Sequence, residues 1–172
     1  YWAVSSGPNL VVVNNKFYDF AYGVSVNGTN CIIKNNVFAL NRHQGITIYS
    51  GTNTIVHKNS ITLRGMNSSV EFGMRFYDSN ISSVYGNTIA STESTPLGRG
   101  IYIYNSASPQ VNSNIVYNFD TGVDAQSTTY VLKFNMINGA NTTMTGDGLP
   151  EQAGVTATVN YNADPSDIYS NI

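Results

Sequence analysis

Polar and apolar positions recur along the chain with a period of a little over twenty residues. In six segments an asparagine stands two residues before an apolar side chain. These marker asparagines are Asn15, Asn36, Asn59, Asn87, Asn114 and Asn135, and the steps between them are 21, 23, 28, 27 and 21 residues. A fixed polar marker that returns at this period is typical of a solenoid, in which each repeat stacks on the previous one.

Each repeat predicts three short strands. Apolar residues stand three positions before the markers, at Val12, Ile33, Val56, Val84, Val111 and Leu132. Others stand two positions after them, at Phe17, Phe38, Ile61, Ile89, Val116 and Ile137. After a bend, a glycine begins an alternating strand in five repeats, at Gly23, Gly45, Gly73, Gly100 and Gly122. We therefore expect an all-β fold of about six to seven coils.

Period-two alternation divides the glycine-led strands into an inner and an outer face. The inner face is predicted to hold Val24, Val26, Ile46, Ile48, Met74, Phe76, Ile101, Ile103, Val123 and Ala125. The outer face holds one column of Ser25, Thr47, Arg75, Tyr102 and Asp124, and a second of Asn27, Tyr49, Tyr77, Tyr104 and Gln126.

The marker asparagines have a structural explanation. A bend that recurs in every coil leaves backbone groups without partners inside a narrow turn. An Asn amide can donate to the coil on one side and accept from the coil on the other. All six markers are therefore predicted to form an asparagine ladder.

Composition narrows the functional classes. Charged residues make up only 10% of the 172 residues, the formal charge is -2, and the 23 asparagines favour tight turns over helices. The chain has no basic cluster that would predict a nucleic-acid partner, and no apolar run long enough for a membrane span. Cys31 is the single cysteine and falls on an inner position, so it predicts neither a disulfide nor a thiolate metal site.

The markers, the inner stacks and the glycine-led strands together resemble the right-handed parallel β-helix of the pectate-lyase-like superfamily, over about residues 5 to 137. The resemblance implies that the glycine-led strands form the first sheet and that the ladder lies between the second and third sheets. It also implies an extracellular or cell-surface protein whose cleft runs along the first sheet, walled by loops that enter from the third.

The whole chain, residues 1–172, is expected to form one domain and to be part of a longer protein. Coils occupy about residues 5–137, a loop residues 138–154, and a terminal coil or cap residues 155–172, with a strand candidate at 155–159. An uncapped solenoid end exposes strand edges, which predicts end-to-end self-association.

Two insertions lie between the ladder turn and the glycine-led strand, around residues 65–71 and 91–98. Beside them the first sheet is predicted to present a patch that binds a polysaccharide through tyrosine faces and hydroxyls. The predicted substrate-binding residues are Tyr49, Tyr104, Arg99, Asp78 and Asp124. The alternative is a tyrosine ladder that only stabilises an exposed sheet face.

Two reactions are considered for this patch. In β-elimination on a uronic acid, Arg75 would neutralise the carboxylate or act as base, and Tyr77 or Tyr102 would supply the acid or base. Lyases of this superfamily often use Lys and Arg with bound calcium, so calcium is a candidate cofactor, although the first sheet carries no Lys and the chain no tight acidic cluster.

In hydrolysis, Glu71 and Asp120 would form the carboxylate pair, since both stand two residues before their glycines and two coils apart, roughly 10 Å. His43 and His57 are isolated and are interpreted as surface residues.

Two functions from different classes remain open. The first is an extracellular β-helix that binds, and in one version cleaves, a polysaccharide. The second is a non-catalytic surface protein, such as an adhesin or a fibre subunit that assembles end to end. A fold by itself does not choose between them.

Overall fold

A computed structural model gives the structure of the chain and describes residues 2–65, 70–95, 97–126, 129–133, 135–140 and 142–146. Strands of the first sheet are β1 (Trp2–Ser6), β4 (Tyr22–Asn27), β7 (Gln44–Tyr49), β10 (Phe72–Tyr77), β13 (Arg99–Tyr104), β16 (Thr121–Gln126) and β19 (Thr142–Gly146). The second sheet holds β2 (Val11–Val13), β5 (Ile32–Lys34), β8 (Thr52–His57), β11 (Asn80–Tyr85), β14 (Ala107–Asn112) and β17 (Thr129–Lys133). The third holds β3 (Lys16–Tyr18), β6 (Val37–Asn41), β9 (Ser60–Leu63), β12 (Thr88–Ser91), β15 (Ile115–Tyr117) and β18 (Met136–Asn138).

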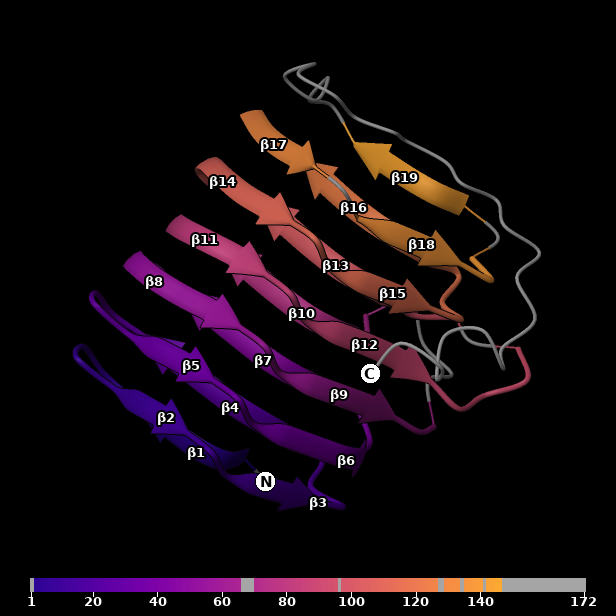
Figure 1. Ribbon diagram of the computed structural model, residues 1–172, viewed down its shortest axis with the longest axis horizontal. Helices are drawn as coiled ribbons and strands as arrows, with labels where there is room; N and C mark the ends of the chain where they lie inside the picture. The colour runs from indigo at the N-terminus through magenta and orange to yellow at the C-terminus, as the bar shows by residue number, and fades with distance from the viewer. Residues whose placement is uncertain are drawn as a thin grey trace.

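The chain winds through the three sheets in turn. Successive strands enter different sheets. From β4 onward, each strand pairs in parallel with the strand three places earlier in the chain. The strand orders of the three sheets are therefore β1-β4-β7-β10-β13-β16-β19, β17-β14-β11-β8-β5-β2 and β18-β15-β12-β9-β6-β3. Figure 1 shows this as stacked coils, with equivalent strands lying side by side. The described residues form no helix, as the all-β prediction required.

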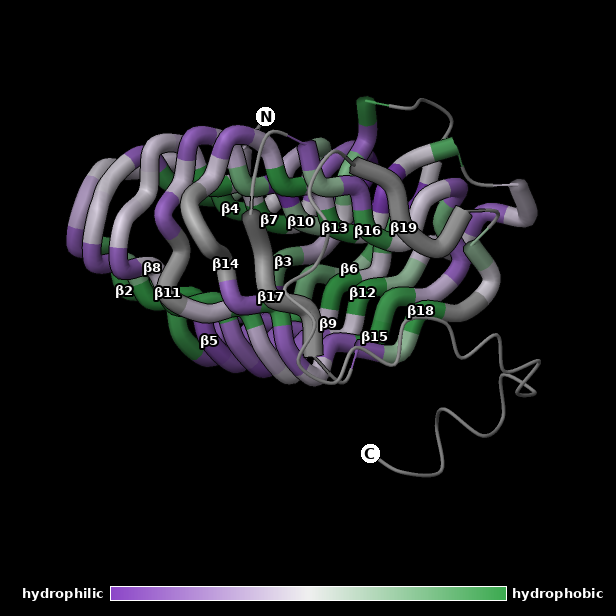
Figure 2. The backbone as a smooth tube through the Cα atoms, turned by 90° about the horizontal axis from the view of Figure 1, so that it is seen from above, coloured by the Kyte–Doolittle hydropathy of each residue, from purple (hydrophilic) through white to green (hydrophobic). Residues whose placement is uncertain are grey.

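The core lies between the sheets and follows the predicted alternation. All ten inner positions of the glycine-led strands are buried, and so are ten of the apolar residues that flank the markers. Those ten are Val12, Ile33, Val56, Val84, Val111, Phe38, Ile61, Ile89, Val116 and Ile137. Figure 2 shows the coils side by side, with apolar residues recurring at matching places in successive coils. Burial of this apolar surface stabilises the stack by roughly 25 cal/mol per Å².

The asparagine ladder runs without a break from Asn15 to Asn135. At its centre Asn87 Nδ2 donates to Asn114 Oδ1 at 2.9 Å and to the carbonyl of Val56 at 3.0 Å. Asn87 Oδ1 accepts from the backbone N–H and the side-chain amide of Asn59, both at 3.0 Å. The ladder therefore satisfies the backbone groups that the turn between the second and third sheets leaves unpaired.

Other asparagines serve a different turn geometry. Seven of them adopt positive φ: Asn9, Asn14, Asn30, Asn35, Asn53, Asn105 and Asn118. Asparagine reaches the left-handed region more readily than most residues, which accounts for its abundance in a chain with so many turns.

The glycines that begin the first-sheet strands stand where neighbouring coils approach closely. A Cβ on Gly73 would lie 2.3 Å from Ile89 Cγ2 and 2.5 Å from the Gly100 carbonyl oxygen. The equivalent atom on Gly45 would lie 2.7 Å from the Gly73 carbonyl oxygen. Glycine is required here by close packing, not by an unusual φ.

The structure corrects two boundaries. Coils begin at Trp2, before residue 5, because β1 pairs with β4. Strand β19 lies inside the predicted loop 138–154, since Thr142–Gly146 pairs with β16 and continues the first sheet. The predicted cap at 155–172, with its strand candidate, lies outside the described residues.

Candidate functional site

The outer face of the first sheet carries the two predicted columns in register. Arg75 aligns with Thr47 and Tyr102, and Tyr77 aligns with Tyr49 and Tyr104. Parallel pairing brings equivalent positions of neighbouring coils about 4.8 Å apart, so these side chains form one contiguous patch. We call Tyr49, Phe72, Arg75, Tyr77, Tyr102 and Tyr104 the aromatic patch.

One correction concerns the first outer column. Thr47 is fully buried, Asp124 is 2% exposed and Ser25 is 8% exposed, although all three face away from the core. Long neighbouring side chains engage two of these short ones, Thr47 and Asp124. Thr47, for example, donates from Oγ1 to Gln44 Oε1 at 2.6 Å.

Arg75 lies among aromatic rings. Its guanidinium carbon is 5.2 Å from the ring centres of Phe72 and Tyr77 and 5.4 Å from that of Tyr49. Its Nη1 also donates to the Tyr49 hydroxyl at 3.1 Å. Cation–π contact and this hydrogen bond therefore hold the positive charge in a defined place on the patch.

The rings of the patch stack on one another. Tyr77 and Tyr104 lie 4.8 Å apart with 19° between their planes, and Phe72 and Tyr102 lie 5.0 Å apart at 25°. Ring faces are therefore packed against neighbouring rings. This arrangement agrees with the tyrosine-ladder alternative and leaves hydroxyls and ring edges, not central ring faces, for any ligand.

Arg99 and Asp124 form an ion pair at the edge of the patch. Arg99 Nε donates to Asp124 Oδ2 at 2.6 Å, and Gln126 Nε2 donates to both oxygens of the same carboxylate at 3.2 Å. Asp124 is thus already engaged by two side chains. Its predicted contact with a sugar, like that of Arg99, stays a prediction.

Tyr102 lies beside this ion pair. Burial raises the pKa of the Tyr102 phenol above its ordinary value, and the nearby Asp124 carboxylate raises it further. The hydroxyl therefore stays protonated at neutral pH and acts as a hydrogen-bond donor, which suits the predicted acid and not the predicted base.

The predicted carboxylate pair is two coils apart, as expected. The carbonyl of Glu71 accepts from Arg99 N–H, and Asp120 N–H donates to the Gly98 carbonyl in the coil between them. Glu71 is only 4% exposed, whereas Asp120 is half-buried. Asp78, another predicted binding residue, is exposed in the turn after β10 and accepts from Asn105 Nδ2 at 2.6 Å.

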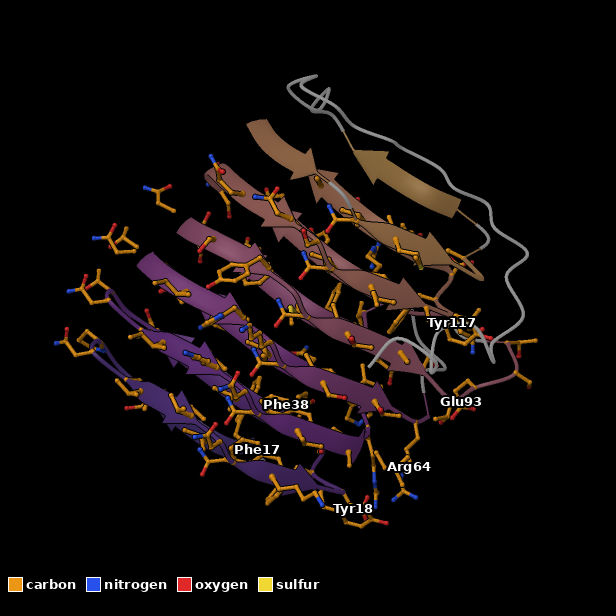
Figure 3. The ribbon with its side chains drawn as sticks, viewed as in Figure 1. Phe17, Tyr18, Phe38, Arg64, Glu93 and Tyr117 are labelled. Atoms are coloured by element: carbon orange, nitrogen blue, oxygen red, sulfur yellow. The ribbon has the colours of Figure 1, made fainter. Side chains whose placement is uncertain are left out.

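A second site lies where the third sheet turns back to the first. Arg42, His43, Arg64, Gly65 and Glu93 line a hollow of about 490 Å³. Figure 3 shows Arg64 and Glu93 along the same edge of the molecule, beyond the ends of β9 and β12. The hollow lies beside the two insertions, at the turn from the third sheet to the first. The groove over Arg75 stays a prediction.

The hollow is held together by contacts between coils. Asp19 Oδ1 accepts from Arg42 at 3.4 Å and also pairs with Arg64. Glu93 Oε1 accepts from the Gly65 N–H. The two guanidinium groups lower the pKa of Asp19, with the Arg64 hydrogen bond as the largest favourable cause, so this carboxylate stays ionised.

His43 forms part of the wall of the hollow. Its Nδ1 lies 2.7 Å from Glu71 Oε1, and the imidazole side chain is 43% exposed while that of Glu71 is 5% exposed. In the tautomer of the neutral imidazole that carries its hydrogen on Nδ1, Nδ1–H donates to the Glu71 carboxylate and Nε2 is left as an acceptor. His43 was predicted to be an isolated surface residue; it is instead paired with the predicted catalytic Glu71.

The sequence offered one signal for this hollow. Asp19 and Arg42 are 23 residues apart, and Arg42 and Arg64 are 22 apart, so each step is close to one repeat. Charges separated by one period lie on neighbouring coils and can pair. The insertions obscured this signal, because they break the period just beyond Arg64.

Neither a metal cluster nor a membrane helix is found in the described part of the chain. It holds no group of three or more His, Cys, Asp or Glu side chains placed to bind an ion. Among the same residues there is no helix with the length and apolar character needed to cross a bilayer.

Comparison with known proteins agrees with the architecture. The family model described as a right-handed β-helix region matches residues 2–163. No curated protein and no solved structure matches the chain significantly. With the family model covering nearly the whole chain and three parallel sheets wound as a solenoid, this protein belongs to the right-handed β-helix family.

Proposed function

We propose that this β-helix acts outside the cell and binds an extended polysaccharide along the aromatic patch of the first sheet. The observation that carries the proposal is the row of three tyrosines in register on neighbouring strands, with Arg75 bonded to the first of them. Tyrosine hydroxyls at a regular spacing of about one coil can bond to successive hydroxyls of a repeating glycan.

The stacking of the rings defines how the glycan would be held. Because ring faces within the patch pack on each other, the sugar would meet hydroxyls and ring edges. Hydrogen bonds, with the Arg75 charge beside them, would then supply most of the specificity. A row of equivalent side chains along a sheet suits a long polymer better than a small enclosed ligand.

Binding is better supported than cleavage. Of the residues considered for catalysis, Glu71 is buried against His43, and the Tyr102 phenol stays protonated at neutral pH. Arg75 is held by three rings and one hydroxyl. Catalytic roles for Arg75, Tyr77, Tyr102, Glu71 and Asp120 stay predictions, as does a role for calcium.

The second candidate is a non-catalytic structural β-helix, an adhesin or fibre subunit. Ring-on-ring stacking favours it, since stacked tyrosines stabilise a sheet face without any ligand. In that case the patch would matter for stability and not for recognition.

A glycan array, combined with an ultraviolet assay for unsaturated uronate products with and without calcium, separates these functions. For any glycan that binds, we expect Arg75→Gln and Tyr77→Phe each to weaken binding about three- to tenfold, the value of one lost hydrogen bond. Tyr117→Phe is the matched control, because Tyr117 lies on β15 of the third sheet.

The outcomes are distinct. Binding without an unsaturated product supports a recognition module, and product formation would add lyase activity at the same patch. Silence on every glycan, or equal binding by Arg75→Gln, Tyr77→Phe and the control, would contradict the proposal and favour the structural candidate.

A further inference from the structure

The hollow beside His43 has two features of a binding site. It is concave, and the five residues that line it come from three neighbouring coils, with Gly65 and Glu93 in the two insertions. Its wall contains a histidine whose orientation is set by a nearly buried carboxylate. Buried carboxylates that orient an exposed imidazole are uncommon on purely structural surfaces, because burial of the charge has a cost that the hydrogen bond must offset.

Charge determines which ligand fits. The guanidinium groups of Arg42 and Arg64 pair with the carboxylate of Asp19, Glu93 lines the same hollow, and Glu71 adds a third carboxylate beside His43. An acidic ligand would therefore meet more carboxylates than guanidinium groups. A neutral ligand avoids this repulsion.

Donors and acceptors are both present. Each guanidinium has five N–H donors, and the described contacts of Arg42 with Asp19 use its Nε and Nη2 while those of Arg64 use Nη2. Glu93 supplies carboxylate oxygens, and the His43 imidazole, whose Nδ1 is engaged by Glu71, is 43% exposed. A ligand rich in hydroxyl groups, each both donor and acceptor, matches this combination.

We infer that the hollow binds one neutral sugar residue, with a sugar hydroxyl donating to His43 Nε2 and the arginines donating to sugar oxygens. Glu71 is the positioning residue, since it holds the proton on Nδ1 and keeps Nε2 as an acceptor. The inference rests on the proposed function only in taking a sugar as the ligand, and it uses a separate surface.

The test uses the imidazole signals of the 172-residue chain in ¹⁵N-resolved NMR spectra, because the protein has just two histidines. His57 lies on β8 of the second sheet and is the internal control. Probes are neutral oligosaccharides of glucose, mannose, galactose and xylose, with oligogalacturonate as the acidic match to the galactose oligomer. We expect at least one neutral oligosaccharide to shift His43 in a saturable way without shifting His57.

Variants then assign the contacts. Arg64→Gln and His43→Gln should each weaken binding of that oligosaccharide about three- to tenfold, whereas Lys16→Gln, a surface charge removed elsewhere, should not. Glu71→Gln should change the tautomer signature of His43 and weaken binding, an effect that a merely structural Glu71 would not produce. If Glu71→Gln fails to fold, binding by Arg64→Gln still tests the hollow, because the Arg64 side chain is 41% exposed.

Two results would overturn the inference: no neutral oligosaccharide shifts His43, or oligogalacturonate shifts it at lower concentration than the galactose oligomer. The patch variant Arg75→Gln separates this failure from failure of the proposed function. If Arg75→Gln loses binding and the hollow variants do not, the patch is the only binding site. If the hollow variants lose binding and Arg75→Gln does not, the hollow is the only binding site.

Discussion

At the scale of single residues, sixteen polar or charged residues in the described part of the chain are buried, and several of them serve the fold. Buried ladder asparagines satisfy backbone groups, and a shorter ladder of Ser79 and Ser106 does the same where the first sheet turns to the second. There Ser79 Oγ accepts from Gly51 N–H at 3.1 Å, and Ser106 Oγ accepts from Ser79 N–H at 3.0 Å. Polarity in such a chain is therefore a poor guide to a functional site.

The ladder predicts a large effect for Asn87→Ala. Removing this amide leaves the Val56 carbonyl and the Asn59 N–H buried without their partners. Because each unsatisfied buried group costs about 1–3 kcal/mol, we expect the free energy of unfolding to fall by about 2–4 kcal/mol. Urea denaturation measures this change.

Asn15→Ala is the matched control, because Asn15 is exposed at the start of the same ladder. Its loss should cost about 1 kcal/mol or less. Equal losses for the two variants would show that burial of the ladder does not determine its contribution.

His57 predicts a pH dependence of stability. Burial lowers the pKa of its imidazole below 6.5, and Lys34 and Lys58 lower it further, so the folded protein favours the neutral ring. Below pH 6.5 His57 takes up a proton in the unfolded chain but not in the folded chain, which favours unfolding. The stability that neutral His57 contributes is therefore fully present above pH 6.5 and is lost as the pH falls toward the pKa of His57 in the folded protein.

Urea titrations of the wild type and His57→Gln at about pH 7.5 and about pH 5.5 test this, since the two proteins differ only at that histidine. The wild type should lose more stability on acidification than His57→Gln. An equal loss would assign the pH dependence to other groups.

At the scale of elements, the first-sheet strands are specified by two opposite requirements. Their inner faces need branched or aromatic apolar side chains, whereas the residue at the start of each strand must have no side chain at all. The carbonyl of one glycine occupies the space that a Cβ on the previous glycine would need, so the requirement passes from coil to coil.

Gly73→Ala should therefore destabilise the protein. The new methyl group would overlap Ile89 and the Gly100 carbonyl, and relief of such overpacking costs typically about 1–3 kcal/mol. Thermal denaturation should show a lower midpoint. Gly7→Ala is the control, because the nearest atom to its new methyl group is Asn27 O at 3.8 Å. This variant should change the free energy of unfolding by less than about 0.5 kcal/mol. A loss as large as that of Gly73→Ala would contradict the packing argument.

At the scale of the whole molecule, stacking converts separation in sequence into proximity. Asp19, Arg42 and Arg64 come from three successive coils and form one network, and His43 reaches Glu71 over 28 residues. Insertions that lengthen a coil do not disturb the ladder, because they lie between a third-sheet strand and the next first-sheet strand, away from the ladder turn. Binding surfaces can thus change while the core stays regular.

The repeat made the architecture predictable from sequence. Marker spacing and period-two alternation determined the three sheets, the inner stacks and the ladder, because in a solenoid each residue contacts mainly its equivalents one period away. The same logic placed Arg75 beside Tyr49, Tyr77 and Tyr102. These relations are local and periodic, so a single sequence contains them.

The tertiary structure alone decided what the period does not encode. Stacking of the tyrosine rings, burial of Thr47 and Asp124, and pairing of His43 with Glu71 depend on side-chain conformations. The hollow depends on how two aperiodic insertions leave the stack, and the strand at Thr142–Gly146 on pairing with β16 where the marker pattern has ended. Periodicity specifies the backbone path, whereas side-chain packing across coils specifies the surface, and only the assembled stack brings those side chains together.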